Sequence, residues 1–347
     1  MFLEKHFEKV YMTTIKDVAV LANVSIATVS RVLNGSANVS PELEARVRQA
    51  VHQLGYHPNV LARNLRRSEN KTIGVLVPDT KNPFFAEVAK GVEEVCFSRG
   101  FVAVLCDTDE KPSKAISHLN TLYQQRVAGF AVVSPGYITL PLQRLLDDGV
   151  PLVVIDRALS ALPTDSVVSD NYGGARQAVE HLLQLGHRRI GFIVSNLEHE
   201  TIQGRWGGAR DAMQTAGIHI EPGLVYKFGD ELPESGYAGA EQLLEQEHPP
   251  TAIFAFNDLM AFGLLHYAHK HGILVPKQLS VIGFDDMMMA NYSNPGLTTI
   301  RQPKYELGHE AAEILLERVQ GDTSPVTHLV LPTELVLRAS TAPLVDG

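Results

Sequence analysis

One stretch decides the fold of the N-terminal part of this chain, and it reads Ile15-Lys16-Asp17-Val18-Ala19-Val20-Leu21-Ala22-Asn23-Val24-Ser25-Ile26-Ala27-Thr28-Val29-Ser30-Arg31-Val32-Leu33-Asn34. Apolar residues recur at helical spacing on both sides of a short break: Val18 and Leu21 before it, then Val29, Val32 and Leu33 after it. Within the break, Asn23 tolerates the left-handed conformation that a tight turn needs, and Ser25 can cap the next helix. Two short helices joined in this way form a helix-turn-helix.

A third helix is expected after this pair. Ser40 is a capping residue, Pro41 stands at the first helical position, and acidic residues follow. The helix should run to about Leu54, because Gly55-Tyr56-His57-Pro58 ends it.

The charge of this head differs from that of the rest of the chain. Between Met12 and Lys71 there are eight lysine and arginine residues and four acids, a net charge of +4. The whole chain carries −9, so the remainder carries −13. A basic head on an acidic body suggests a polyanionic partner for the head alone, although a chance fluctuation of a few charges is the alternative.

Length and composition exclude several classes of protein. A chain of 347 residues, 45% apolar and 20% charged, suits two or three globular domains and no disordered or fibrous protein. No apolar run approaches the ~18 residues of a membrane span, and the N-terminus has no secretory signal. Cys96 and Cys106 suit small buried thiols better than a disulfide framework. We therefore expect a soluble, cytoplasmic protein with no membrane contact.

From Thr72 onward, short β-branched runs alternate with helical stretches. The runs are Ile73–Val77, Val102–Leu105, Phe130–Val133, Leu152–Ile155, Ile190–Val194, Ile253–Phe256 and Val281–Phe284. Near-continuous apolar strands that alternate with helices indicate parallel sheets covered on both faces. Because the strands are too many for one sheet, the fold class is α/β with two doubly wound lobes behind an all-α head.

Polar residues follow many of these strands, where ligands bind in open α/β sheets. They include Asp79, Asn82, Asp156, Arg157, Asp170, Asn171, Asn257, Asp258, Asp285 and Asp286. Carboxylates and amides that accept from hydroxyls, an arginine that donates, and the aromatic Phe84 and Phe85 suit an uncharged polyol. Each residue alone also suits a helix cap.

Enzyme signatures are absent from the sequence. There is no glycine-rich phosphate loop, no dinucleotide-binding fingerprint and no nucleophile elbow. His309-Glu310 begins a zinc-protease pattern that Glu313 breaks, and the other histidines are scattered. We therefore expect no catalytic residues, no metal and no cofactor.

With these residues in hand, the chain resembles the lactose/galactose-repressor family of bacterial transcription regulators, from about Thr13 to Ala342. Besides the opening stretch, the matching motifs are Leu54-Gly55-Tyr56-His57-Pro58-Asn59, Leu61-Ala62-Arg63, Leu185-Gly186-His187-Arg188-Arg189-Ile190, Pro250-Thr251-Ala252-Ile253 and Leu297-Thr298-Thr299-Ile300-Arg301-Gln302-Pro303. The resemblance implies a helix-turn-helix head, a hinge helix and a core like periplasmic sugar-binding proteins. It also implies a homodimer on operator DNA. We expect a dimer and not a tetramer, because the residues after Ala342 are too few for the leucine heptads that tetramerise some relatives.

The domain boundaries expected from this resemblance are as follows. Residues 1–11 form an extension, 12–57 the DNA-binding domain, 58–71 the hinge helix, and 72–347 the effector-binding and dimerisation core. Within the core, lobe one should comprise about 72–171 and 303–331, and lobe two about 172–302 and 332–347.

The resemblance also implies which residues contact DNA. Ile26, Ala27 and Arg31 should face bases, with Arg31 the main polar contact because the other two side chains cannot hydrogen-bond a base edge. The remaining DNA-binding candidates are Thr14, Ser25, Thr28, Ser30, Asn34, Asn59, Leu61, Ala62 and Arg63.

In the core, the chain resembles ribose-binding members of the wider superfamily. The implied effector-binding residues are Asn82, Phe84, Phe85, Asp156, Arg157, Asp170, Thr201, Arg205, Asn257, Asp285 and Gln302. Two departures argue against a purine base: Glu231 replaces an aromatic, and His199 stands where purine-binding relatives have arginine. The resemblance thus implies a repressor that senses a sugar, a pentose such as ribose being favoured, or a nucleoside. A sugar-binding transport component or an enzyme on the same core is the alternative.

Overall fold

The computed structural model describes residues 13–33, 39–56, 70–133, 138–157, 159, 162–195, 197, 199–227 and 231–344. The chain divides into two compact units, Met1–Asn70 and Lys71–Gly347. The extension predicted at residues 1–11, and the hinge helix predicted at 58–71 apart from its last two residues, lie outside the described residues.

The first unit contains the predicted helix-turn-helix and the third helix: α1 (Ile15–Ala22), α2 (Ile26–Leu33) and α3 (Pro41–Leu54). Thr14 caps α1 in a reciprocal capping box with Asp17. The Thr28 N–H donates to Ser25 Oγ over 3.1 Å at the start of α2, which confirms the predicted cap. Ser40 caps α3.

The turn between α1 and α2 depends on a left-handed residue. Asn23 has φ 50° and ψ 53°, as predicted for this position. The Arg46 guanidinium of α3 donates to the carbonyls of Ala22 (2.6 Å) and Asn23 (3.1 Å). This cation therefore satisfies carbonyls that the end of α1 leaves without helical partners.

The head has its own small core of Val18, Ala19, Ala22, Val29, Val32, Val47, Ala50 and Tyr56. The prediction that Leu21 belongs to the apolar face was wrong, because Leu21 is 48% exposed. Val18 and Ala22, one turn apart, face the core instead, and the small side chain of Ala22 allows the helices to approach closely.

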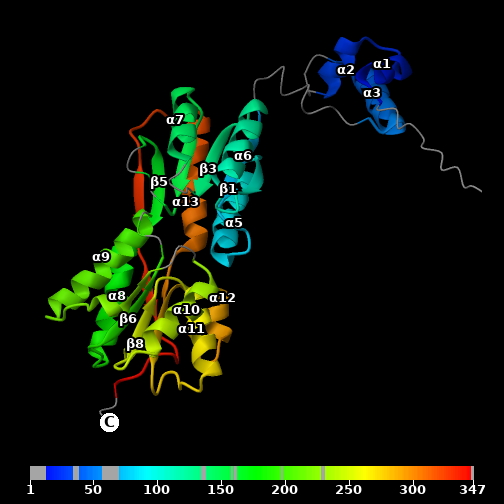
Figure 1. Ribbon diagram of the computed structural model, residues 1–347. Helices are drawn as coiled ribbons and strands as arrows, with labels where there is room; N and C mark the ends of the chain where they lie inside the picture. The colour runs from blue at the N-terminus through cyan, green and yellow to red at the C-terminus, as the bar shows by residue number, and fades with distance from the viewer. Residues whose placement is uncertain are drawn as a thin grey trace, which may run out of the picture. The chain divides into compact units, whose positions relative to one another are not determined.

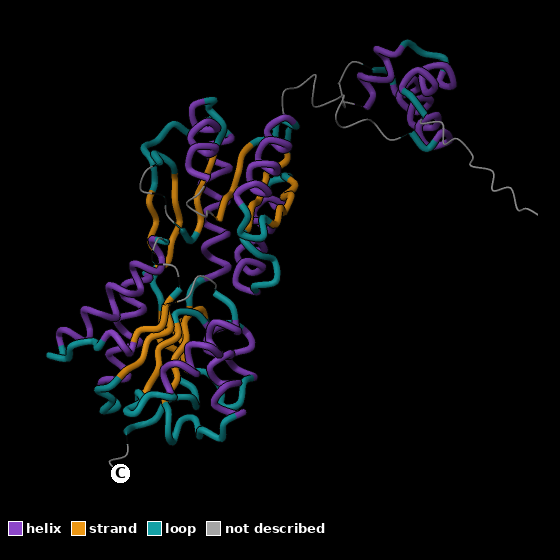
Figure 2. The backbone as a smooth tube through the Cα atoms, viewed as in Figure 1, coloured by secondary structure: helices purple, strands orange, loops and turns teal. Residues whose placement is uncertain are grey.

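The second unit contains two six-stranded sheets, each covered by helices (Figures 1 and 2). The sheet of lobe one has the order β11-β5-β4-β3-β1-β2 and is parallel throughout. Its strands are β1 (Thr72–Val77), β2 (Val102–Asp107), β3 (Gly129–Val133), β4 (Leu152–Ile155), β5 (Asp165–Ser169) and β11 (His328–Leu331). Its helices are α5 (Pro83–Ser98), α6 (Pro112–Gln124), α7 (Thr139–Asp147) and α13 (Lys304–Val319).

The sheet of lobe two has the order β12-β10-β9-β8-β6-β7, and only the edge pair β10 and β12 is antiparallel. Its strands are β6 (Ile190–Val194), β7 (Val225–Lys227), β8 (Ala252–Ala255), β9 (Ser280–Asp285), β10 (Thr298–Arg301) and β12 (Glu334–Val336). Its helices are α8 (Asn171–Gln184), α9 (Glu200–Thr215), η2 (Pro222–Leu224), α10 (Pro233–Leu244), α11 (Asp258–Lys270) and α12 (Met288–Tyr292).

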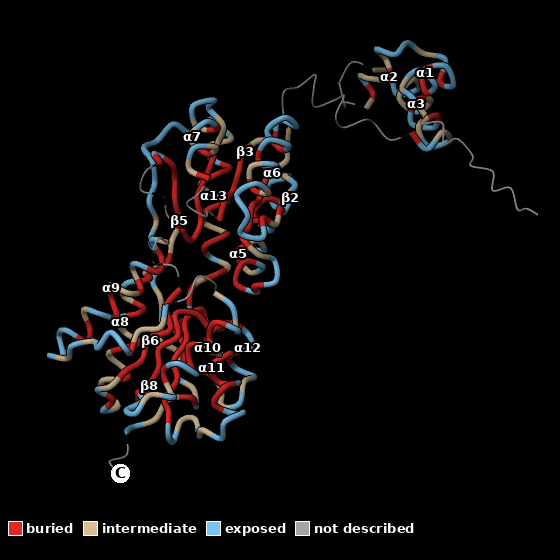
Figure 3. Tube along the Cα trace, in the orientation of Figure 1, coloured by how far each residue is buried: buried red, intermediate tan, exposed pale blue. Residues whose placement is uncertain are grey.

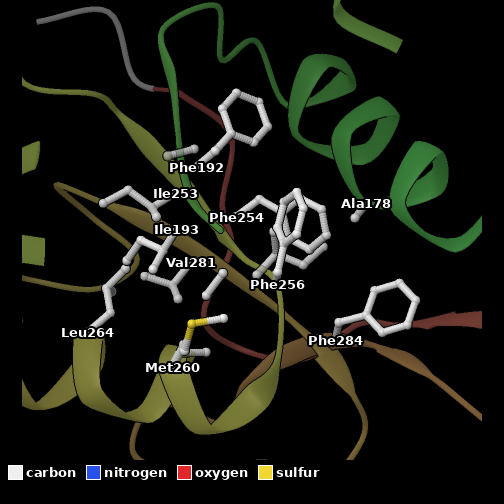
Figure 4. Close-up of a cluster of buried hydrophobic side chains, with 14 of the residues drawn as sticks. Ala178, Phe192, Ile193, Ile253, Phe254, Phe256, Met260, Leu264, Val281 and Phe284 are labelled. Atoms are coloured by element: carbon white, nitrogen blue, oxygen red, sulfur yellow. The ribbon is translucent and has the colours of Figure 1, made fainter. Parts of the chain in front are cut away.

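The predicted fold class and all seven predicted strands are confirmed, with shifts of a residue or two at some ends. The central strands of each sheet are almost continuously buried, as Figure 3 shows, whereas the edge strands β2, β7, β11 and β12 are largely exposed or half-buried. In lobe two, Phe192, Phe254, Phe256 and Phe284 fill the core together with aliphatic residues of α8, α9 and α11 (Figure 4). Within the described residues, no helix is both long and apolar enough to cross a membrane.

The chain passes between the lobes three times: from β5 to α8, from β10 to α13, and from β11 to β12. Each lobe is therefore completed by a segment from the far end of the chain. The carboxyl ends of the parallel strands of both lobes lie near these crossings, where ligands bind in this class of fold.

Candidate functional site

A pocket lies between the lobes, at the carboxyl ends of the strands. It is lined by Asn82, Phe84, Phe85, Asp156, Arg157, Thr201, Ile202, Arg205, Glu231, Asp285 and Gln302. It contains about 310 Å³ of space between atoms, of which about 20 Å³ admits the centre of a water molecule. Little free space therefore remains between the side chains that the two lobes contribute.

The structure brings together nine of the eleven residues expected to bind an effector. Asp170 and Asn257 are not in this lining: each caps a helix, α8 and α11 respectively. Ile202 and Glu231 line the pocket although they were not among the candidates. The sequence marks Glu231 only as a departure from relatives. Ile202 follows Thr201 in the first turn of α9, and its apolar side chain gave no reason to expect it in a polar pocket.

Arg205 of α9 connects the strand ends of lobe two. Its Nε donates to Asn171 Oδ1 at 2.8 Å, and its Nη1 donates to the carbonyl of Phe256. Its Nη2 lies 3.8 Å from Asp285 Oδ1, and the guanidinium lies 3.8 Å from the centre of the Phe284 ring. These contacts fix the orientation of the cation at the pocket wall.

Asp285 is held from two further sides. Gln302 Nε2 donates to Asp285 Oδ1 at 2.7 Å. Lys304 Nζ donates to the carbonyls of Asp285 (2.8 Å) and Asp286 (2.9 Å), and lies 3.8 Å from Glu87 of α5. Burial raises the pKa of Asp285, and the charge of Arg205 opposes this. Lys304 thereby joins the end of β9 to a helix of lobe one.

Asp156 and Arg157 form the lobe-one side of the pocket. Burial raises the pKa of Asp156 to about 6, against the opposing charges of Arg157 and Arg205. Arg157 Nη2 donates to Glu110 Oε1 at 3.1 Å, so one side of the guanidinium is held in place.

Three buried polar atoms of the pocket have no hydrogen-bond partner within the part of the chain that the structure describes: Asp156 Oδ1, Arg157 Nη1 and Gln302 Oε1. They comprise two acceptors and one donor. Leaving such groups buried without partners costs about 1–3 kcal/mol each. The arrangement is therefore suited to a ligand whose groups both donate and accept hydrogen bonds.

Glu231 lies in the pocket wall and feels the charges of both arginines. Burial raises its pKa, but the charges of Arg157 and Arg205 outweigh burial, so its pKa lies below its usual value. Ser195 Oγ donates to Glu231 Oε1 at 3.0 Å, and Asn257 Nδ2 donates to its carbonyl at 3.1 Å. Glu231 is therefore a fixed anion.

The backbone at the strand ends is strained. Asp156 has φ 65°, Asp285 has φ 126°, and Asp286 has φ 53°. Residues other than glycine rarely adopt such values, and the surrounding structure must hold them there. The strain turns two carboxylates, one from each lobe, into the same pocket.

Phe84 and Phe85 provide the apolar part of the lining. Asn82 Oδ1 accepts from the Phe84 N–H at 3.0 Å and so caps α5. The two rings meet edge to face, with centroids 5.2 Å apart. Their carbon faces give the pocket an apolar surface.

In the head, α2 has a buried face and an exposed face. Val29 and Val32 are buried, whereas Ile26, Ala27 and Arg31 are exposed. Thr14 and Ser25 are also exposed, and Thr28 and Ser30 are half-buried beside that face. Five DNA-binding candidates lie outside the described residues: Asn34, Asn59, Leu61, Ala62 and Arg63.

Known families match both units. Residues 14–59 match the family described as bacterial regulatory proteins, lacI family. Residues 179–341 match the periplasmic binding protein-like domain.

Individual relatives match over most of the chain. The HTH-type transcriptional repressor PurR of Haemophilus influenzae (strain PittEE) is 38% identical over 95% of this chain and 98% of its own. The Lac repressor dimer bound to operator and the anti-inducer ONPF has a TM-score of 0.85 at 28% identity, covering 95% of this chain and 99% of that one. A LacI family transcriptional regulator from Enterococcus faecium, solved with bound ribose, has a TM-score of 0.72 at 34% identity, covering 79% and 100%.

Proposed function

Because this chain belongs to the lacI family of bacterial regulatory proteins and is a transcriptional repressor of that family, we propose that a small uncharged polyol bound between its lobes controls its affinity for operator DNA. One observation carries the proposal: the unpartnered polar atoms of Asp156, Arg157 and Gln302 converge in a single buried pocket. Hydroxyl groups donate to the two acceptors and accept from the arginine.

The charges of the pocket support an uncharged ligand. Two buried carboxylates, Asp156 and Asp285, and the half-buried Glu231 stand beside two arginines, Arg157 and Arg205. An anionic ligand would meet the three acids. A cationic ligand would compete with Arg157 and Arg205 for these acids. Both arginines are already held in place, by contacts to Asn171, Phe256 and Glu110.

Within the polyols, we favour a pentose. The ribose-bound regulator of Enterococcus faecium supports the same class. A purine base is the alternative suggested by the name of the PurR relatives. A fixed anion at Glu231 offers no flat apolar surface for such a base.

A thermal-shift screen of the full-length protein tests the ligand class, since a ligand that binds only the folded state raises its melting temperature. The compounds are D-ribose and other pentoses, hexoses, nucleosides, and the bases adenine, guanine and hypoxanthine. We expect a pentose to give the largest shift. A shift with purine bases alone would overturn the polyol proposal and leave the assignment as a repressor intact.

For the DNA-binding surface, we propose that Ile26, Ala27 and Arg31 face bases in the major groove. The two apolar side chains contact thymine methyl groups, and Arg31 donates to a guanine. Thr14, Ser25, Thr28 and Ser30 contact phosphates and set the register. Five further contacts remain predictions. They are a phosphate contact at Asn34 and operator contacts at Asn59, Leu61, Ala62 and Arg63.

We further propose that the protein acts as a homodimer. Exposed apolar side chains on β2 and α12 of the core support this, with Val102 63%, Met288 68% and Tyr292 71% exposed. The similar Lac repressor structure is a dimer on its operator.

The regulator match at residues 14–59 favours a transcriptional repressor over the alternative of a transport component.

A further inference from the structure

A second pocket lies on lobe two and shares no lining residue with the pocket between the lobes. It has a volume of about 880 Å³. Its lining comprises Trp206, Arg210, Gln214, Gly217, Ile218, His219, Ile220, Pro222, Val225 and Lys227. We call it the α9–β7 pocket. Neither the family matches nor the proposed control by a polyol gives it a role.

Local sequence explains how the pocket forms. Trp206, Arg210 and Gln214 are spaced four residues apart on α9, so their side chains lie along one face of the helix. Gly217, with φ 72°, turns the chain after the helix, and the following residues lead to β7. Because β7 is the edge strand of its sheet, no strand formed by the described residues of lobe two covers that side.

The charge of the pocket is unusual for this acidic protein. Among the described residues that line it there are Arg210, Lys227 and His219 but no aspartate or glutamate. Of the two nearest acids in the sequence, Glu221 pairs with Arg189. Asp211 accepts from Tyr172 Oη at 2.9 Å and forms an exposed ion pair with Arg210, with Arg210 Nε 3.3 Å from Asp211 Oδ1. One acid beside the lining therefore stands against its two permanent cations. The local field therefore favours an anion.

Trp206 gives the pocket a rigid aromatic wall. Phe192 meets the indole edge to face, with centroids 5.6 Å apart, and Phe256 lies 6.4 Å away at a tilt of 42°. These contacts hold the indole, and neither phenylalanine stacks parallel to it. A planar ring of a ligand can make that stacking contact, and Ile218, Ile220 and Val225 add apolar surface.

We propose that the α9–β7 pocket binds a small organic anion that carries a planar ring, of the size of a nucleoside monophosphate. The ring stacks on Trp206, and the anionic group is held by Arg210 and Lys227 through charge-assisted hydrogen bonds. The ring and the charge are both required, because each engages a different part of the lining.

Trp206 is the only tryptophan of the chain, so its fluorescence reports on this pocket directly. Full-length protein is titrated with adenosine 5′-monophosphate, with excitation where the nucleotide does not absorb. We expect a saturable change in fluorescence. Adenosine, which lacks the charge, and inorganic phosphate, which lacks the ring, should bind at least about tenfold more weakly. A linear change without saturation, or equal affinity for phosphate alone, overturns the proposal.

Variants locate the binding event. Arg210→Gln and Lys227→Gln should each weaken the nucleotide by about tenfold, whereas Lys277→Gln, the same change in an exposed turn of lobe two, should not. Asp285→Asn, which alters the pocket between the lobes, should leave the nucleotide titration unchanged. Loss of the signal in Asp285→Asn, with both cation variants unaffected, would place the nucleotide between the lobes and refute this site. The thermal-shift screen with polyols tests the pocket between the lobes, and its result does not depend on the nucleotide titration.

Discussion

At the scale of single residues, the pocket between the lobes is a set of buried charges whose orientations are fixed and whose pairing is incomplete. Arg205 is held by Asn171 and Phe256, and Arg157 is held by Glu110. The atoms left without a partner point to where a ligand completes the network. Changes to one side chain should therefore separate ligand binding from folding.

Asp285→Asn should abolish the response to D-ribose and leave operator binding intact. The amide keeps the shape of the side chain but replaces the charged acceptor that Gln302 and Arg205 position. The measurement is the ribose-induced shift in melting temperature, together with operator binding by fluorescence anisotropy. Asp211→Asn, on the outer face of α9, is the matched control. An unchanged ribose shift in Asp285→Asn would mean that the ligand binds elsewhere.

Asp156 should make the stability of the free protein depend on pH. Its pKa rises from 3.8 to about 6 on burial, so the folded protein keeps a proton that the unfolded chain loses in this range. The contribution of Asp156 to the free energy of unfolding should therefore fall as pH rises through this window, by up to about 3 kcal/mol.

Urea unfolding of wild type and Asp156→Asn between about pH 4.5 and about pH 7 checks this dependence. The advantage of the variant over wild type should grow as pH rises and should level off above about pH 6. A difference that is constant across the range would show that Asp156 does not titrate there in the folded protein.

Arg31→Ala should cost about 1–3 kcal/mol of specific operator binding and relax the preference at one base pair. The reason is that Ile26 and Ala27, its neighbours on the exposed face of α2, cannot hydrogen-bond a base edge. Binding to operator variants and to random duplex measures this. An equal loss on random DNA would instead identify Arg31 as a phosphate contact.

At the scale of elements, capping determines where the helices of the head begin and end. The capping box of Thr14 and Asp17, the left-handed Asn23 and the cap at Ser25 place α2 at a defined angle to α1. The next element expected along the chain, the hinge helix at residues 58–71, lies for the most part outside the described residues and stays a prediction. A helix of this length is marginal alone and should form against its twin on DNA.

Leu61→Gly tests the hinge helix. The resemblance to the family implies that Leu61 wedges into the minor groove at the centre of the operator, where unstacking a base step costs a few kcal/mol. We expect weaker operator binding and loss of helical protection at the hinge, measured by hydrogen exchange on operator DNA. If the variant binds operator as tightly as wild type and still releases it with ligand, the segment is a simple tether.

At the scale of the whole molecule, the three chain crossings make each lobe depend on both halves of the sequence, so that closure of the lobes can be transmitted through the core. Lys304 is one such connection, since it bonds to the carbonyls at the end of β9 and lies near Glu87 of α5. Hinge closure coupled to the order of a short segment is a known form of switching. The proposed dimer would place two such segments together.

Sedimentation of the full-length protein should show a dimer at micromolar concentration. The exposed apolar residues of β2 and α12 are costly to leave in water and are suited to burial against a second copy. Met288→Lys together with Tyr292→Lys should shift the protein towards monomer and weaken binding to a palindromic operator, because two heads are needed for two half-sites. A wild-type monomer that does not pair on DNA would refute the dimer.

Features that depend on local spacing could be predicted from the sequence alone. Helix periodicity and capping residues located the helix-turn-helix, and near-continuous apolar strands located seven strands of two parallel sheets. Strand ends pointed to Asp156, Arg157 and Asp285, because ligands bind at the carboxyl ends of parallel strands whatever the rest of the fold. The exposure of Leu21 was missed because periodicity alone does not show which of two neighbouring positions faces the partner helix.

Only the tertiary structure decided which strand-end residues face the pocket and which cap a helix. Asp170 and Asn257 carry the same side-chain groups as residues of the pocket, yet their oxygens bond to nearby backbone N–H groups. Glu231 and Ile202 reach the pocket through the arrangement of the elements around it, which no local pattern encodes. The raised pKa of Asp156 and the unpartnered atoms beside it arise from burial, and burial is a property of the assembled lobes.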